Sequence, residues 1–129
     1  MIRPRIHHFH SPDVEDLDAA RPAAGSDFSV LVQIFVGPEG SEGFESFDIQ
    51  IVTPGWLHEE CASDGFASGE HRLIVFDYDW PRIEGYLRKR IAACSGRDWT
   101  EVAHKIGRFA WWEFEDYEPY EGVGRPGGA

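Results

Sequence analysis

The hydrophobic pattern is clearest in two strand-like runs between Phe28 and Thr53, FSVLVQIFVGPEGSEGFESFDIQIVT. In residues 28–36, apolar side chains fall on both sides of an extended chain, which predicts a strand buried on both faces. In residues 47–51, apolar and polar side chains alternate, which predicts a strand with one face in water. The connection of residues 37–43 is too long for a two-residue turn and carries Gly, Pro and Glu. The pattern therefore predicts a hairpin with a protruding acidic loop, which we expect to be the nucleus of a sheet.

Two further strands are predicted outside this hairpin. Residues 2–9 read as an edge strand, because Pro4 lacks a backbone donor that only an edge can spare. Residues 70–78, EHRLIVFDY, contain a continuous apolar run that predicts a third central strand, buried on two sides. Between the first strand and the hairpin, Ser11-Pro12-Asp13 indicates a helix start or a turn.

Three helices are predicted from their capping residues. Thr53 followed by proline starts a short helix that ends near Gly65. Asp79-Trp80-Pro81 starts the longest helix, which Gly96 is placed to stop. Asp98 begins the last one. The apolar stripes of the last two helices follow helical spacing and comprise Ile83, Tyr86, Leu87, Ile91, Cys94, Trp99, Val102, Ala103 and Ile106.

The order of these elements predicts an α+β fold. We expect a single domain with a mainly antiparallel or mixed sheet of four to five strands and two to three helices packed on it. The domain should cover residues 1–117, and residues 118–129 should form a flexible Gly/Pro-rich tail. A chain of 129 residues is long enough to bury one core and too short for two.

Charge narrows the choice of partners. The chain carries 12 Lys and Arg against 23 Asp and Glu, a formal net charge of −11. Such a chain repels phosphate, which argues against nucleic acids and anionic membranes as partners and favours basic ones. The alternative is that the acidity serves solubility alone.

Cysteine usage and the N-terminal segment bear on location. Cys61 and Cys94 show no C-x-x-C spacing, so we expect a reduced pair. The N-terminal residues lack the apolar segment of a signal peptide, and no apolar run approaches the roughly 20 residues that span a bilayer. These features lead us to expect a cytoplasmic protein.

A histidine cluster in the first predicted strand offers the main alternative function. His8 and His10 share one side of that strand, His7 lies beside them, and Asp13 follows in the next turn. Two histidines at this spacing can bind a metal, but a third ligand is not evident in the sequence. A metal-binding domain or small enzyme that uses this cluster therefore stays as the alternative.

Other catalytic motifs are incomplete. His58-Glu59-Glu60-Cys61 lacks the second histidine of H-E-x-x-H, and no G-x-S-x-G nucleophile motif occurs. Residues 37–43 place carboxylates where a phosphate-binding loop needs amide donors and a lysine. We therefore predict no catalytic residues, no cofactor and no metal.

Acidic residues beside aromatic ones stand out instead. One block lies on the hairpin loop and includes Phe44, the other lies near the C-terminus, and neither contains Lys or Arg. This composition is typical of a binding patch for a basic protein. The alternative is that the aromatic residues are core, and we prefer it for Trp112 and Phe114. The predicted partner-binding residues are Glu39, Glu42, Glu45, Trp111, Glu113, Glu115, Asp116 and Tyr117.

Several of these segments together resemble the immunity protein 8 family, and the likeness runs in order over residues 1–117. The segments are GPEG at 37–40, SFDIQIVTPGWL at 46–57, LIV at 73–75, YDWP at 78–81 and WEFEDY at 112–117. Members are predicted antidotes in bacterial polymorphic toxin systems, encoded beside the toxin that they neutralise. The resemblance implies an α+β fold, a non-enzymatic function and a cognate toxin domain as partner.

The resemblance supplies no toxin-binding surface, so the contact residues above rest on charge and exposure. The acidity favours a basic toxin domain, such as a nuclease. An acidic face can neutralise such a domain by plugging its active site or by covering its substrate path.

Overall fold

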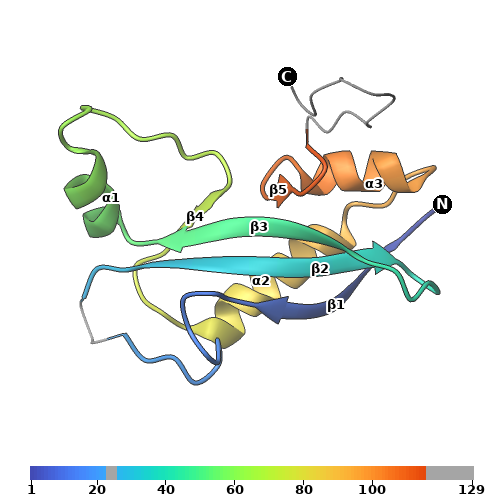
Figure 1. The fold of residues 1–129 in the computed structure, drawn as a ribbon, viewed down its shortest axis with the longest axis horizontal. Coiled ribbons are helices and arrows are strands. Elements are labelled where there is room, and N and C mark those ends of the chain that lie inside the picture. The colour runs from blue at the N-terminus through green and yellow to red at the C-terminus, as the bar shows by residue number, and fades with distance from the viewer. Residues whose placement is uncertain (23–25, 116–129) are drawn as a thin grey trace, which may run out of the picture.

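The structure is a computed structural model that describes residues 1–22 and 26–115. Within these residues it contains five strands and three helices in an α+β arrangement (Figure 1). Their bounds are β1 Pro4–His10, β2 Ser29–Pro38, β3 Glu45–Val52, α1 Pro54–Cys61, β4 Arg72–Ile74, α2 Trp80–Ala92, α3 Trp99–Ile106 and β5 Trp111–Trp112. None of the described helices is long and apolar enough to cross a membrane.

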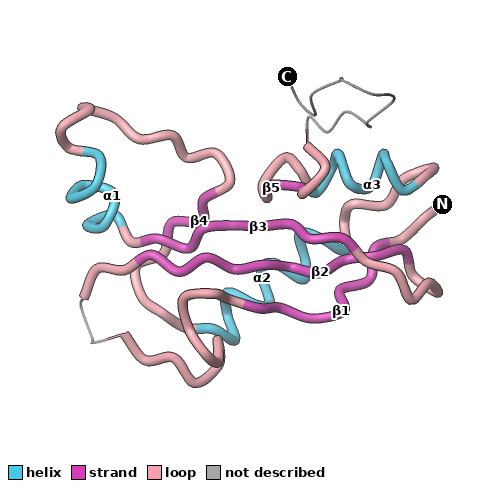
Figure 2. Tube along the Cα trace, in the orientation of Figure 1, coloured by secondary structure: helices cyan, strands magenta, loops and turns pink. Residues whose placement is uncertain are grey.

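The strands form one mixed sheet in the order β1-β2-β3-β4. β1 and β2 are antiparallel, as are β2 and β3, whereas β4 runs parallel to β3. β5 pairs with β3 as well, antiparallel to it. Since β2 occupies one edge of β3, the two short strands β4 and β5 share the other (Figure 2). The predicted mixed sheet is confirmed, and so is the edge position of the first strand.

A single hydrophobic core lies on one face of this sheet. Alternate residues of β2 and β3 point into it, and α2 and α3 pack against them, with α2 behind the sheet in the view of Figure 1. The fully buried side chains with the largest volumes are Phe47, Ile34, Ile51, Leu87, Ile91, Ile106, Val32, Val36, Val52 and Val102. Burial of this apolar surface is the main stabilising term of the fold.

The opposite face of the sheet is open, and this corrects one prediction. Leu31 and Phe35, expected to be buried, are only half-buried, because α2 and α3 both cover the other face. On β3, Ser46, Asp48 and Gln50 are half-buried on the same open face, as the alternation predicted. The apolar residues on the second side of β2 therefore meet other side chains at a surface rather than a second core layer.

The prediction of a central strand at residues 70–78 is wrong. Only Arg72–Ile74 pair with β3, at an edge, and Ile74 is 44% exposed. Phe76 is 88% exposed. A continuous apolar run does not by itself distinguish a central strand from an edge strand followed by an exposed connection.

The β2–β3 hairpin is confirmed, and its loop depends on one close backbone approach. A Cβ atom at Gly37 would lie 1.8 Å from the carbonyl oxygen of Gly43. A side chain at this position therefore does not fit, and glycine lets the acidic loop fold back on β2.

The predicted helix starts are confirmed by their caps. The side chains of Thr53, Asp79 and Asp98 each accept a hydrogen bond from the backbone of the first helical turn. Tyr86, predicted to lie on the buried side of α2, is 43% exposed instead. At residues 11–13 the structure has a turn, in which the Ser11 hydroxyl accepts the backbone N–H of Asp13 at 3.0 Å.

Candidate functional site

An exposed aromatic cluster lies on the open face near the hairpin. His8 of β1 is opposite Phe35 of β2 in the pairing register, and their rings stack with centroids 4.4 Å apart. Phe44, from the hairpin loop, meets Phe35 edge-on at 5.4 Å and His8 at 5.8 Å. The ring of Phe44 is nevertheless 48% exposed. The pairing register shifts between Ile6 and His8, so that His8 lies opposite Phe35.

A carboxylate lies beside this cluster without a cationic partner. Asp48 of β3 is directly opposite Trp111 of β5, so both side chains are on the open face. Burial raises the pKa of Asp48, and hydrogen bonds from Ser46 and Gln33 oppose this shift only in part. The described residues form two ion pairs, Arg88–Glu84 and Arg97–Glu101, and neither involves Asp48.

We refer to the residues His8, Phe35, Phe44, Asp48 and Trp111 as the open-face cluster. They come from four strands and the hairpin loop. Trp111 is 45% exposed, and its ring lies 4.8 Å from that of the buried His71. The cluster thus offers rings and one desolvated carboxylate on a surface that no described helix covers.

The residues of the predicted binding patch separate into two groups. Glu39 and Glu42 are exposed on the hairpin loop, and Glu115 is exposed after β5. Glu45 points inward, where its Oε1 accepts the indole N–H of Trp99 at 2.7 Å and that of Trp112 at 2.9 Å.

The structure also joins the two acidic blocks. Glu113 is exposed, but its Oε1 accepts the backbone N–H of Ser46 at 2.7 Å. Its own backbone N–H donates to the carbonyl of Ser46 at 3.0 Å. The segment after β5 is therefore tied to the start of β3, beside the hairpin. Asp116 and Tyr117 lie outside the described residues.

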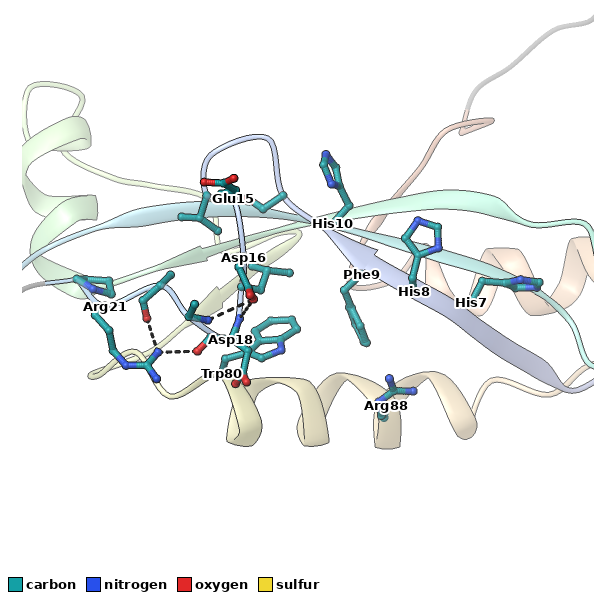
Figure 3. A pocket seen from close by; sticks show the side chains of 16 residues that line it. His7, His8, Phe9, His10, Glu15, Asp16, Asp18, Arg21, Trp80 and Arg88 are labelled. Carbon is teal, nitrogen blue, oxygen red and sulfur yellow. Dashed lines mark hydrogen bonds between the residues drawn. The ribbon is translucent and has the colours of Figure 1, made fainter.

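The histidine cluster does not assemble into a metal site. His7, His8 and His10 line a cleft of about 1070 Å³ between β1, residues 11–22 and α2. Figure 3 shows the three imidazoles spaced along the strand without converging on one point. Among residues 1–22 and 26–115, no group of three or more His, Cys, Asp or Glu side chains can hold a metal ion.

Two charged groups that line this cleft make local hydrogen bonds to the backbone. Asp16 Oδ1 accepts the backbone N–H groups of Asp18 and Ala19, at 2.9 and 3.3 Å, which is a local turn. The guanidinium of Arg21 donates to backbone carbonyls rather than to a carboxylate, as the dashed lines in Figure 3 show. Asp16 and Arg21 therefore stabilise the local fold of residues 16–21.

Comparison with known proteins decides the family. The sequence profile described as Immunity protein 8 matches residues 5–117. The chain belongs to the immunity protein 8 family. A search of curated proteins returns no significant match, and a search of solved structures returns none either.

Membership of the immunity protein 8 family confirms the resemblance seen in the sequence. It implies an immunity protein whose partner is a cognate toxin, and it favours a non-enzymatic role. The family does not identify the contact surface. Sequence reasoning missed His8, Phe35 and Asp48 as candidate contact residues, although the alternation in β3 had already placed Asp48 on the wet face.

Proposed function

We propose that this immunity protein neutralises a cationic cognate toxin domain, encoded by a neighbouring gene, by binding it through the open-face cluster and the acidic hairpin loop. The observation that carries the proposal is the ring pair of half-buried Phe35 and exposed Phe44 on the same sheet face as Asp48, a partly buried carboxylate that forms no ion pair with the described residues. The bound chain covers either the active site of the toxin or the path of its substrate.

The aromatic rings supply the apolar part of the interface. Exposed aromatic side chains held by neighbouring rings lose little conformational freedom on binding, and such residues dominate the energetics of protein interfaces. Phe44 has this setting, because its ring contacts His7, His8 and Phe35 while half of its surface faces solvent. We assign it the role of the central anchor.

The carboxylates supply complementarity to a basic partner. Asp48 is already partly desolvated, so a Lys or Arg of the toxin gains an ion pair without the full cost of desolvating this carboxylate. Glu39 and Glu42 on the loop, together with the net charge of −11, attract a cationic partner at longer range. We assign Glu45 a structural role, since its carboxylate is shared by two indoles.

A direct test measures binding to the toxin domain encoded by the adjacent gene, carrying an inactivating substitution in its own active site. We expect Phe44→Ala to weaken the complex at least about tenfold in isothermal titration calorimetry, as for an anchoring aromatic residue. The matched control is Tyr86→Ala, which removes a ring of similar exposure, 43% against 48%, from α2 on the core side of the sheet. This control should leave the affinity unchanged.

Charge reversal tests the electrostatic part separately. Glu39→Lys combined with Glu42→Lys should slow association and flatten its dependence on salt concentration. The proposal fails if wild-type protein does not bind the toxin domain. The surface assignment fails if Tyr86→Ala weakens binding while Phe44→Ala and the loop reversal do not.

A further inference from the structure

The helix α1 differs from α2 and α3 because it contributes no side chain to the core, although Gly55, Trp56, Leu57 and Cys61 are half-buried. None of the eight residues of Pro54–Cys61 is buried. A helix of this length has little stability of its own in water. Its N-cap residue anchors it to the sheet: Thr53 Oγ1 accepts the backbone N–H of Trp56 at 3.3 Å and also that of Phe28 at 3.1 Å. The rest of α1 projects from the end of β3, as Figure 1 shows at the left of the view.

An apolar groove runs between α1 and the chain that follows it. It measures about 370 Å³ and is lined by Pro54, Leu57, His58, Cys61, Ala62, Gly65, Phe66 and Ala67. The helical residues in this set recur at positions i, i+3, i+4 and i+7, which is the spacing of one helix face. Phe66, from the chain that follows the helix, also lines the groove and is 78% exposed. The groove therefore combines a helix face that is at most half-buried with an exposed ring.

The charge of this segment restricts what can occupy the groove. Residues 54–71 contain Glu59, Glu60, Asp64 and Glu70, and they contain no Lys or Arg. All four carboxylates are exposed. A second copy of this chain would bring like charges together at this face, which is unfavourable. A partner segment with an apolar side chain flanked by basic residues matches both the groove and its rim.

The geometry points to the α1 groove as a second contact for the cationic toxin domain, an inference that rests on the proposed function. The hairpin precedes β3 and α1 follows it, so the two surfaces lie at opposite ends of the strand. The eight residues of β3 span roughly 26 Å at the usual rise of a strand. A compact domain of about 100 residues has a radius of gyration near 13 Å, so one toxin domain lying along the sheet can reach both ends.

Substitution of Phe66 tests the contact. We expect Phe66→Ala to weaken binding of the inactivated toxin domain at least about tenfold. The substitution should leave the stability of the free chain nearly unchanged, because the ring is exposed. Phe76→Ala is the matched control: Phe76 is 88% exposed but does not line the groove, so its removal should not change the affinity.

Cysteine alkylation gives a second readout that needs no substitution. Cys61 lines the groove and is half-buried, whereas Cys94 is buried and its thiol donates to the carbonyl of Arg90. Burial raises the pKa of Cys94, which lowers its thiolate fraction, so iodoacetamide should modify Cys61 first. With free toxin domain at ten times its dissociation constant, only about one-tenth of the chain is unbound, and alkylation of Cys61 should slow by about tenfold.

The two measurements separate this inference from the proposed function. Protection of Cys61 together with the loss caused by Phe66→Ala supports the α1 contact. If wild-type protein binds the toxin domain but Cys61 stays reactive and Phe66→Ala binds normally, the α1 contact is wrong and the proposed function stands. If wild-type protein does not bind, both are wrong.

Discussion

Replacing Glu45 with alanine should destabilise the fold, although the sequence presented this residue as part of an acidic binding loop. Its Oε1 accepts the indole N–H groups of Trp99 and Trp112, at 2.7 and 2.9 Å. Trp99 begins α3 and Trp112 ends β5, so one carboxylate joins both elements to the start of β3. Glu45→Ala removes both hydrogen bonds and leaves two indole donors without their acceptor.

The magnitude follows from the type and exposure of these bonds. A hydrogen bond to a charged acceptor contributes about 1.5–3 kcal/mol, and a donor left without a partner in the interior adds to the loss. Both tryptophans are only partly buried, so water replaces part of the lost interaction. We therefore take the lower end of the range for each bond and expect a loss of about 2–3 kcal/mol in the free energy of unfolding.

Urea unfolding followed by tryptophan fluorescence measures this loss. With a denaturant slope of about 1.5–2 kcal/mol/M, the midpoint should fall by about 1–2 M. Glu45→Gln keeps an acceptor oxygen and should lose less. Glu42→Ala removes an exposed carboxylate from the adjoining hairpin loop. The stability of this variant should stay within about 0.5 kcal/mol of wild type.

An unchanged stability of Glu45→Ala would contradict the structural role of Glu45. If Glu45→Ala unfolds at the same urea concentration as Glu42→Ala, the two indole bonds do not hold α3 and β5 in place. If it also binds the toxin domain at least about tenfold more weakly, Glu45 is a contact residue as the sequence predicted.

Two further substitutions test individual interactions. Burial raises the pKa of Asp48, so the folded chain holds this proton more tightly than the unfolded chain does. The resulting stabilisation is complete below the unfolded pKa of about 3.9 and is lost as pH rises through the folded pKa. Asp48→Asn should therefore be more stable than wild type at pH 7 in urea unfolding and lose this advantage toward acidic pH; lower stability at pH 7 would contradict the shift. Tyr78→Phe removes the hydroxyl that donates to the carbonyl of the buried Leu17 and should cost about 1 kcal/mol in thermal unfolding, whereas no change would show that other contacts hold this segment.

Local signals predicted much of the fold. Thr53, Asp79 and Asp98 were identified as helix caps from the residues that follow them, and each one caps its helix in the structure. The hairpin was equally readable, because its polar connection separates two runs of extended periodicity. These features depend on neighbours within a few residues, which the sequence displays directly.

Features that depend on distant segments were not predictable in the same way. The apolar run at residues 73–76 looked central, but β5 shares the same edge of β3, and only Arg72–Ile74 pair there. Phe35 looked buried because the sequence does not show which sheet face the helices cover. Both errors arise because burial is predicted from the apolar character of the side chains alone.

The sequence predicted only part of the candidate site, for the same reason. Composition identified acidic residues beside aromatic ones, but it did not distinguish Glu45, which holds the fold together, from Glu39, which faces solvent. The stacking of His8 on Phe35 depends on the β1–β2 register. That register shifts between Ile6 and His8, and the shift places His8 opposite Phe35. Strand register is a tertiary property, so no local pattern reveals this pair.

Among the carboxylates of residues 1–22 and 26–115, Asp48 is the one whose pKa burial raises. A carboxylate that burial partly desolvates, and that no cation of the described chain neutralises, lowers the stability of the free protein. An asparagine of nearly the same shape would accept similar hydrogen bonds without this cost. The cost is offset when a partner supplies the missing cation, and the adjacent rings of Phe35 and Phe44 provide apolar surface for the same partner. Replacing Asp48 with asparagine should thus raise the stability of the free chain and weaken its binding to a cationic partner.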